Sequence, residues 1–71
     1  MNHYVWQERY EAAMLETKAA LIQLRIVEAE NALLDRIEDE VYGRCILDKE
    51  EREAIERARQ FLGALRVAYA A

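Results

Sequence analysis

Hydrophobic and polar residues alternate along the last third of the chain with the period of an α-helix. Apolar residues recur there at three- and four-residue intervals: Ile55, Ala58, Leu62, Leu65 and Tyr69. Asp48, with Glu51 three residues later, has the arrangement of a helix N-cap. The pattern therefore predicts a helix over residues 48–70. Gly63 inside it either permits a close approach to a neighbouring helix or is tolerated on an exposed face.

Gly43 marks the expected end of the preceding helix, because glycine readily adopts the left-handed conformation that closes a helix. Residues 43–47 then form a short connection to Asp48. Short connections of this kind join neighbouring antiparallel helices, so we expect a helical hairpin.

The segment from His3 to Tyr42 contains neither proline nor glycine, and Asn2 is a suitable residue to cap its start. As one helix it would carry two apolar seams on opposite sides. The first seam, which faces the last helix, contains Leu15, Ala19, Ile22, Ile26, Ala29, Leu33 and Ile37. The second seam contains Trp6, Tyr10, Ala13, Thr17, Ala20, Leu24 and Val27, with Met14 and Leu21 on its flank.

Two arrangements of this segment are possible. A continuous helix would extend residues 3–17 beyond the hairpin, where only another chain could cover them. A turn near Thr17 would instead fold the first segment back as a third helix. Lys18-Ala19-Ala20 contains no turn-forming residue, which favours continuity. The fold class predicted either way is all-α, a single helical domain over residues 1–71 that associates into a helical bundle.

Composition and charge exclude several functions. The net charge of −4 disfavours binding to nucleic-acid phosphates. The longest apolar stretch is too short to span a membrane, and no signal peptide is visible, so we expect a cytoplasmic protein. One cysteine cannot form an internal disulfide. Cys45 is either made reactive by Arg44 or, more simply, is a partly buried loop residue. With a lone His3, no metal, cofactor or catalytic site can be assembled, and we expect no enzyme.

Several short motifs resemble a group of short, uncharacterised bacterial helical proteins. They are Leu15-Glu16-Thr17, Arg25-Ile26, Ala29-Glu30, Leu33, Arg36-Ile37, Glu50-Glu51, Ala54-Ile55-Glu56 and Leu65-Arg66. The resemblance covers residues 15–66 and brings no activity or site. Members of that group tend to have Asp-Pro after Leu-Glu-Thr, which implies a turn and three helices. Lys18-Ala19 stands at that position here.

The functional prediction follows from the uncovered second seam. A two-helix hairpin of this size is marginally stable alone, so we expect a homodimer or a complex with a partner protein. The candidate interface residues are Trp6, Tyr10, Ala13, Thr17, Leu21, Leu24 and Val27. The chain is thus interpreted as a protein–protein interaction or self-assembly module. The alternative is a small acidic regulator, antitoxin- or inhibitor-like, in which the acids from Asp35 to Glu40 bind a basic partner.

Overall fold

The computed structural model describes residues 4–69, and these form three α-helices. They are α1 (Gln7–Leu15), α2 (Ala19–Val41) and α3 (Lys49–Ala68). The all-α prediction is therefore confirmed. The predictions for Asn2, for His3 and for a helix end at residue 70 lie outside the described residues. Within residues 4–69 no helix is long and apolar enough to cross a membrane.

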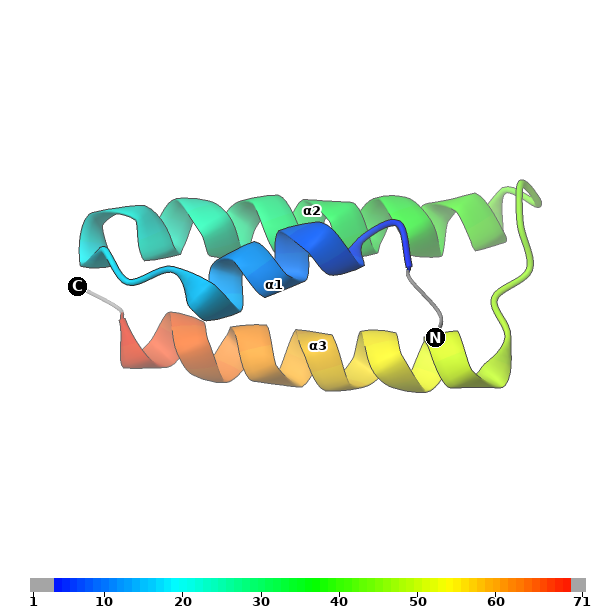
Figure 1. Cartoon of the computed structure of the whole chain (residues 1–71). Coiled ribbons are helices and arrows are strands. Elements are labelled where there is room, and N and C mark those ends of the chain that lie inside the picture. The colour runs from blue at the N-terminus through cyan, green and yellow to red at the C-terminus, as the bar shows by residue number, and fades with distance from the viewer. Residues whose placement is uncertain (1–3, 70–71) are drawn as a thin grey trace.

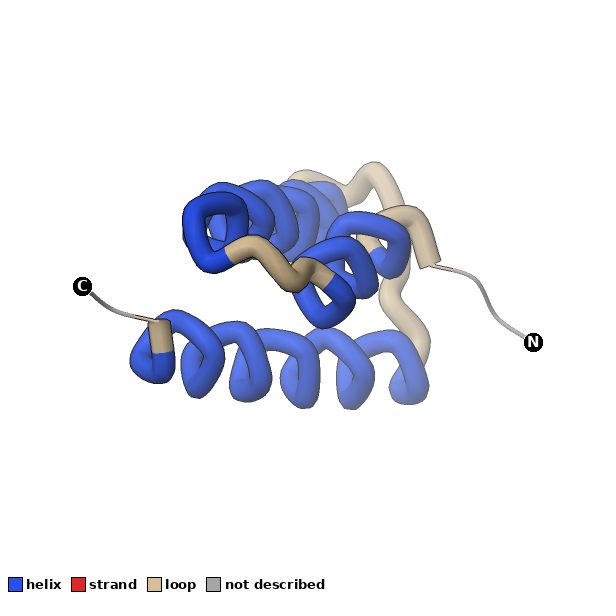
Figure 2. Tube along the Cα trace, turned by 60° about the vertical axis from the view of Figure 1, so that its left-hand side comes forward, coloured by secondary structure: helices blue, strands red, loops and turns tan. Residues whose placement is uncertain are grey.

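The helices form a flattened bundle with extents of 37 × 25 × 15 Å. Helix α3 runs antiparallel to α2, as the short connection predicted, and α1 lies in front of both (Figure 1). Figure 2 shows α1 packed beside α2, with α3 crossing below the pair. Since α1 is only 9 residues long, it is too short to be stable in water without such packing.

The core lies where the three helices meet. Its largest fully buried side chains are Ile26 and Leu33 of α2 and Leu62 of α3. Ile22, Ala29, Ile55 and Ala58 of the predicted hairpin contact are also buried. The first seam is shorter than predicted, because Leu15 and Ala19 are exposed on either side of the break between α1 and α2. Trp6 and Ala13 bring α1 into the same cluster.

The helix expected to be continuous through Thr17 is broken, so that prediction was wrong and the alternative turn is observed. Residues 16–18 are not helical, and Glu16 and Lys18 have extended backbone conformations. Neither glycine nor proline causes the break. It costs a few helical hydrogen bonds, but it lets Trp6 and Ala13 reach a core that an extended helix could not reach.

A carboxylate supports each of the two connections. Glu16 accepts hydrogen bonds from the Lys18 backbone N–H and the Arg25 guanidinium, both at 3.2 Å. Glu40 likewise accepts from the backbone N–H of Leu47 at 2.9 Å and from Arg52 at 2.6 Å. These bonds favour the charged form and lower the pKa of both carboxyls.

The end of α2 has the geometry predicted for Gly43. Its φ is +77°, and the N–H of Arg44 donates to the carbonyl of Asp39 at 2.8 Å, as in a Schellman motif. At the start of α3 the Asp48 carboxylate accepts from the Glu51 N–H at 2.7 Å, which confirms the N-cap.

Gly63 is not needed for close helix packing. A Cβ atom added there would have no neighbour within 4 Å. The interpretation in which Gly63 permits a close helix contact is therefore wrong, and this glycine is a tolerated residue inside α3.

The two glycines should respond to alanine in opposite directions. Gly63→Ala should stabilise the chain by about 1 kcal/mol, because alanine favours the helix. That raises the melting temperature by roughly 4–8 °C. Gly43→Ala should lower it by a similar amount, because alanine is strained at positive φ. Thermal unfolding followed by circular dichroism measures both; equal shifts of the same sign would contradict these assignments.

Candidate interaction surfaces

The position of α1 depends on one buried carboxylate, that of Glu51. Its Oε2 atom accepts a hydrogen bond from the Trp6 indole Nε1 at 3.2 Å and another from the Arg36 Nε at 2.8 Å. Its Oε1 atom accepts from the Arg36 Nη2 at 3.1 Å, so the arginine binds in a bidentate manner. Glu51 is only 5% exposed and raises the pKa of the Arg36 guanidinium. One carboxylate of α3 thus joins this helix to α2, through Arg36, and to Trp6 at the start of α1.

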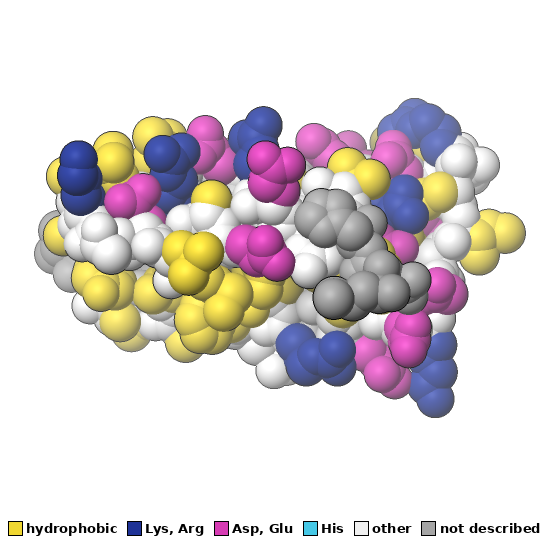
Figure 3. All heavy atoms as spheres, viewed as in Figure 1, with side chains coloured by type: hydrophobic (Ala, Val, Ile, Leu, Met, Phe, Trp, Pro, Cys, Tyr) yellow, Lys and Arg dark blue, Asp and Glu magenta, His cyan; other side chains and the backbone are white. Residues whose placement is uncertain are grey.

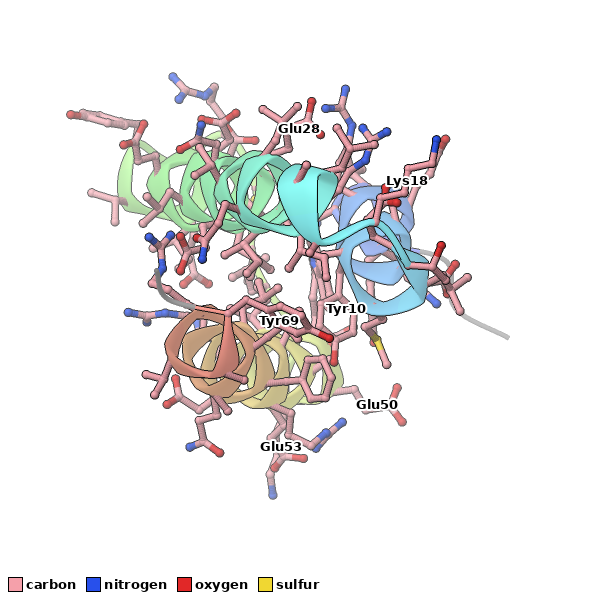
Figure 4. All side chains as sticks on the ribbon, turned by 90° about the vertical axis from the view of Figure 1, so that its left-hand side faces the viewer. Tyr10, Lys18, Glu28, Glu50, Glu53 and Tyr69 are labelled. Atoms are coloured by element: carbon pink, nitrogen blue, oxygen red, sulfur yellow. The ribbon has the colours of Figure 1, made fainter. Side chains whose placement is uncertain are left out.

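A row of aromatic rings extends this contact. The Tyr4 and Trp6 rings stack with centroids 5.3 Å apart, and Trp6 meets Tyr10 edge-on at 6.1 Å. Tyr10 in turn meets Phe61 of α3 edge-on at 6.1 Å. In Figure 4, looking from the end of the bundle, Tyr10 and Tyr69 approach each other between the helices. Tyr10 of α1, and Trp6 immediately before this helix, therefore contact this chain's own α3.

The seven residues proposed as an interface do not form one surface. Trp6 and Ala13 are buried and Tyr10 is half-buried, all against the chain's own helices. Thr17 lies exposed in the connection, and Leu21 is half-buried on α2. Leu24 and Val27 remain exposed, at 50% and 42%. The break at residues 16–18 thus divides the second seam into an inward half on α1 and an outward half on α2.

The outward half continues along the whole of α2. We call this surface the α2 ridge; its residues, all exposed, are Ala20, Leu24, Val27, Asn31, Leu34, Glu38 and Val41. They repeat at alternating four- and three-residue intervals, the spacing of a coiled-coil seam. The ridge lies opposite the buried stripe of α2, on the side where a monomeric helix normally presents polar residues. Leu34 and Val41 are 49% and 74% exposed. In Figure 3, hydrophobic side chains reach the upper surface over the first turns of α2.

Charge is distributed unevenly along α2. In this helix, residues 19–27 carry a net charge of +1, whereas residues 28–41 carry −5. Figure 4 places Lys18 and Glu28 on the α2 side of the molecule, away from α3. Glu28 is paired with Arg25 at 3.1 Å. Asp35, Glu38 and the Lys18 ammonium have no ion-pair partner within residues 4–69.

The acids from Asp35 to Glu40 do not act as one free patch. Asp39 is bound to Arg44 at 2.8 Å, and Glu40 is bound to Arg52. These ion pairs link the end of α2 to the following connection, through Arg44, and to α3, through Arg52. Within residues 4–69, the Asp35 and Glu38 carboxylates are the two of this group that have no ion-pair partner.

A second apolar surface is the groove between α1 and α3. It encloses about 370 Å³ and includes Trp6, Tyr10, Met14, Ala54 and Ala58 in its walls. Hydrophobic side chains gather over the ends of these two helices in the lower left of Figure 3. The aromatic side chains in these walls pack against one another.

No site for a metal ion is present among residues 4–69, where no three potential ligands come together. Cys45 has a free thiol that is half-buried and packs against the core. This position agrees with the prediction of a partly buried loop residue.

Two features of this site were not expected. Glu51 was interpreted as an acid of the N-terminal turn, but its side chain binds Trp6 and Arg36, which are distant in sequence. The predicted second seam ended at Val27, whereas the α2 ridge continues to Val41. The continued four- and three-residue spacing to Leu34 and Val41 was a signal in the sequence that could have extended it.

No protein-family model, no curated protein and no solved structure matches this chain. Its function is therefore inferred from its own residues and their arrangement.

Removing the Glu51 charge should weaken the packing of α1 against the other two helices. Glu51→Gln leaves Arg36 and Trp6 without their anionic acceptor, so we expect a loss of about 2 kcal/mol and a melting temperature roughly 8–16 °C lower. Glu53→Gln makes the same change on an exposed residue of α3 and should shift the melting temperature by less than about 3 °C. Similar melting temperatures for the two variants would contradict the role given to Glu51.

Proposed function

We propose that this chain is a small, non-enzymatic interaction module that self-associates through the α2 ridge. The observation that carries the proposal is the exposure of Leu24, Val27, Leu34 and Val41 on the side of α2 opposite its core. Scattered exposed hydrophobic residues are ordinary, but a regular stripe along six turns is typical of a helix that pairs with another helix. With a single free thiol, the module suits a reducing cytoplasm.

The size of the ridge supports a concentration-dependent dimer. Fully burying a valine or leucine side chain is worth about 1.5–3 kcal/mol. The four ridge side chains are 42–74% exposed, so covering them gives on the order of 3–6 kcal/mol per copy. For two copies this gain is comparable with the cost of association, about 4–15 kcal/mol. At most about 8 kcal/mol remains, the largest gain less the smallest cost, and this corresponds to a dissociation constant in the micromolar range or weaker. The dimer should therefore dissociate on dilution.

Asn31 in the middle of the ridge also fits a specific helix pair. A polar residue at a seam position lowers affinity, but it restricts the partner and register to those that satisfy its amide. An exposed ridge with no such restriction would associate with many apolar helices.

A second candidate is the acidic regulator, favoured by the exposed carboxylates of Asp35 and Glu38 beside the apolar ridge. In this case a basic amphipathic helix of another protein would occupy the ridge in place of a second copy. The two candidates differ in the oligomeric state of the isolated chain.

Size-exclusion chromatography with light scattering tests self-association. At about 100 μM we expect the mass of a dimer, twice the 8.3 kDa of one chain. Leu24→Lys combined with Leu34→Lys should give a monomer, because two charges would be buried in the seam. The melting temperature of the dilute protein should change little, since neither side chain belongs to the core.

Val67→Lys is the matched control, because Val67 is exposed on α3 and lies away from the ridge. This variant should remain dimeric. A wild-type chain that is monomeric at every concentration would contradict self-association and favour the acidic regulator. A dimer that is unaffected by the Leu24 and Leu34 substitutions would place the contact elsewhere.

A further inference from the structure

We propose that residues 16–18 form a hinge, held closed by the Glu16 carboxylate, and that opening this hinge lets α1 pack on α2 and α3 of a second copy. The exchanged α1 makes the same contacts that it makes within a single chain. The inference goes beyond the proposed function, because it needs no contact between α2 ridges and has a test of its own.

The connection at residues 16–18 lacks the local signals that define the other turn. Between α2 and α3, Gly43 adopts a positive φ and the Asp48 side chain caps the next helix. Residues 16–18 contain neither glycine nor proline. Helix α2 begins at Lys18 without a side-chain cap and without an acidic residue in its first turn. The reversal of chain direction between α1 and α2 is therefore only weakly encoded in the connection itself.

The Glu16 side chain stabilises the observed shape of this connection. Its Oε2 atom accepts a hydrogen bond from the Lys18 backbone N–H at 3.2 Å, which fixes a non-helical backbone. Its Oε1 atom accepts from the Arg25 Nε at 3.2 Å, which attaches the connection to α2. With the carboxylate in place the closed form prevails. Without it both bonds are lost, and a helix that continues through residues 16–18 becomes the competing state.

A continuous helix also aligns apolar residues that the closed form leaves in solvent. Leu15 is 78% exposed, and Ala19 is exposed on the other side of the break. In a continuous helix these two residues precede Ile22 at four- and three-residue intervals. They therefore extend the buried stripe of α2 by one turn.

Opening the hinge separates α1 from its own binding surface, so a second copy has to supply that surface. Trp6 and Arg36 share the Glu51 carboxylate in the closed form. A continuous helix would place Trp6 and Arg36 about 45 Å apart. Trp6 and Ala13, now 3% and 2% exposed, would then lie in solvent. Exchange of α1 covers both residues again with contacts that the sequence already provides, which makes it a low-cost route to a dimer.

The direction of α1 is compatible with exchange. Helix α1 turns back along α2 and runs antiparallel to it (Figure 1), with Arg9 at 3.9 Å from Glu28. When two opened chains lie antiparallel about a two-fold axis, α1 of each chain runs along α2 of the other in this same direction. Each contact of α1 then occurs twice by symmetry.

Two hinge variants test the proposal in a chain whose ridge is blocked by Leu24→Lys and Leu34→Lys. Glu16→Ala with Thr17→Ala removes the carboxylate and favours a continuous helix. Glu16→Ala with Thr17→Gly removes the same carboxylate but disfavours the helix, so it is the matched control. By light scattering at about 100 μM, we expect the alanine variant to have twice the 8.3 kDa mass of one chain and the glycine variant to have the mass of one chain.

Isotope-filtered nuclear Overhauser spectroscopy on the alanine variant identifies the exchanged element. The Tyr10 and Phe61 ring centroids are 6.1 Å apart, and we expect contacts of these rings between labelled and unlabelled chains. A monomeric alanine variant, or a dimer whose Tyr10–Phe61 contacts all lie within one chain, would overturn the proposal. Loss of helical circular dichroism in this variant would also overturn it, because the opened form contains more helix. A glycine variant that dimerises equally would contradict the hinge mechanism.

Discussion

The Glu51 carboxylate is the interaction on which the arrangement of the three helices depends. It is almost fully buried, and its oxygens accept from the Arg36 guanidinium and the Trp6 indole. A buried carboxylate is costly unless such donors surround it. Among residues 4–69, each buried polar side-chain atom has a hydrogen-bond partner. The Trp6 hydrogen bond forms only when α1 is folded back, so this one carboxylate links α1 to the pair formed by α2 and α3.

Folding back α1 changes which apolar surface is left uncovered. Trp6 and Tyr10, which would be binding residues on an extended helix, become part of the chain's own core and its aromatic row. The break at residues 16–18 leaves the outer face of α2 exposed, and this face has a regular apolar spacing. The turn thus removes Trp6 and Tyr10 from the candidate interface and leaves the α2 ridge as the regular uncovered apolar surface.

Local signals in the sequence predicted local structure well. Asp48 caps α3 and Gly43 closes α2 because both effects involve atoms only a few residues apart. The turn at residues 16–18 could not be predicted in this way, since its cause is the distant burial of Trp6. The role of Glu51 was missed for the same reason, because a capping pattern accounts for its position but not for the partners of its side chain. Of the residues predicted for an interface, Leu24 and Val27 are exposed, whereas Trp6 and Ala13 are not.

Isotope-filtered nuclear Overhauser spectroscopy on a mixture of labelled and unlabelled chains tests the account most directly, because it separates contacts within a chain from those between chains. We expect the Trp6 indole to show contacts only within its own chain, and the Leu24 methyl groups to show contacts with the α2 ridge of the other chain. Contacts between chains from Trp6 and Tyr10, with none from Leu24, would show that α1 is the binding element and would contradict the account.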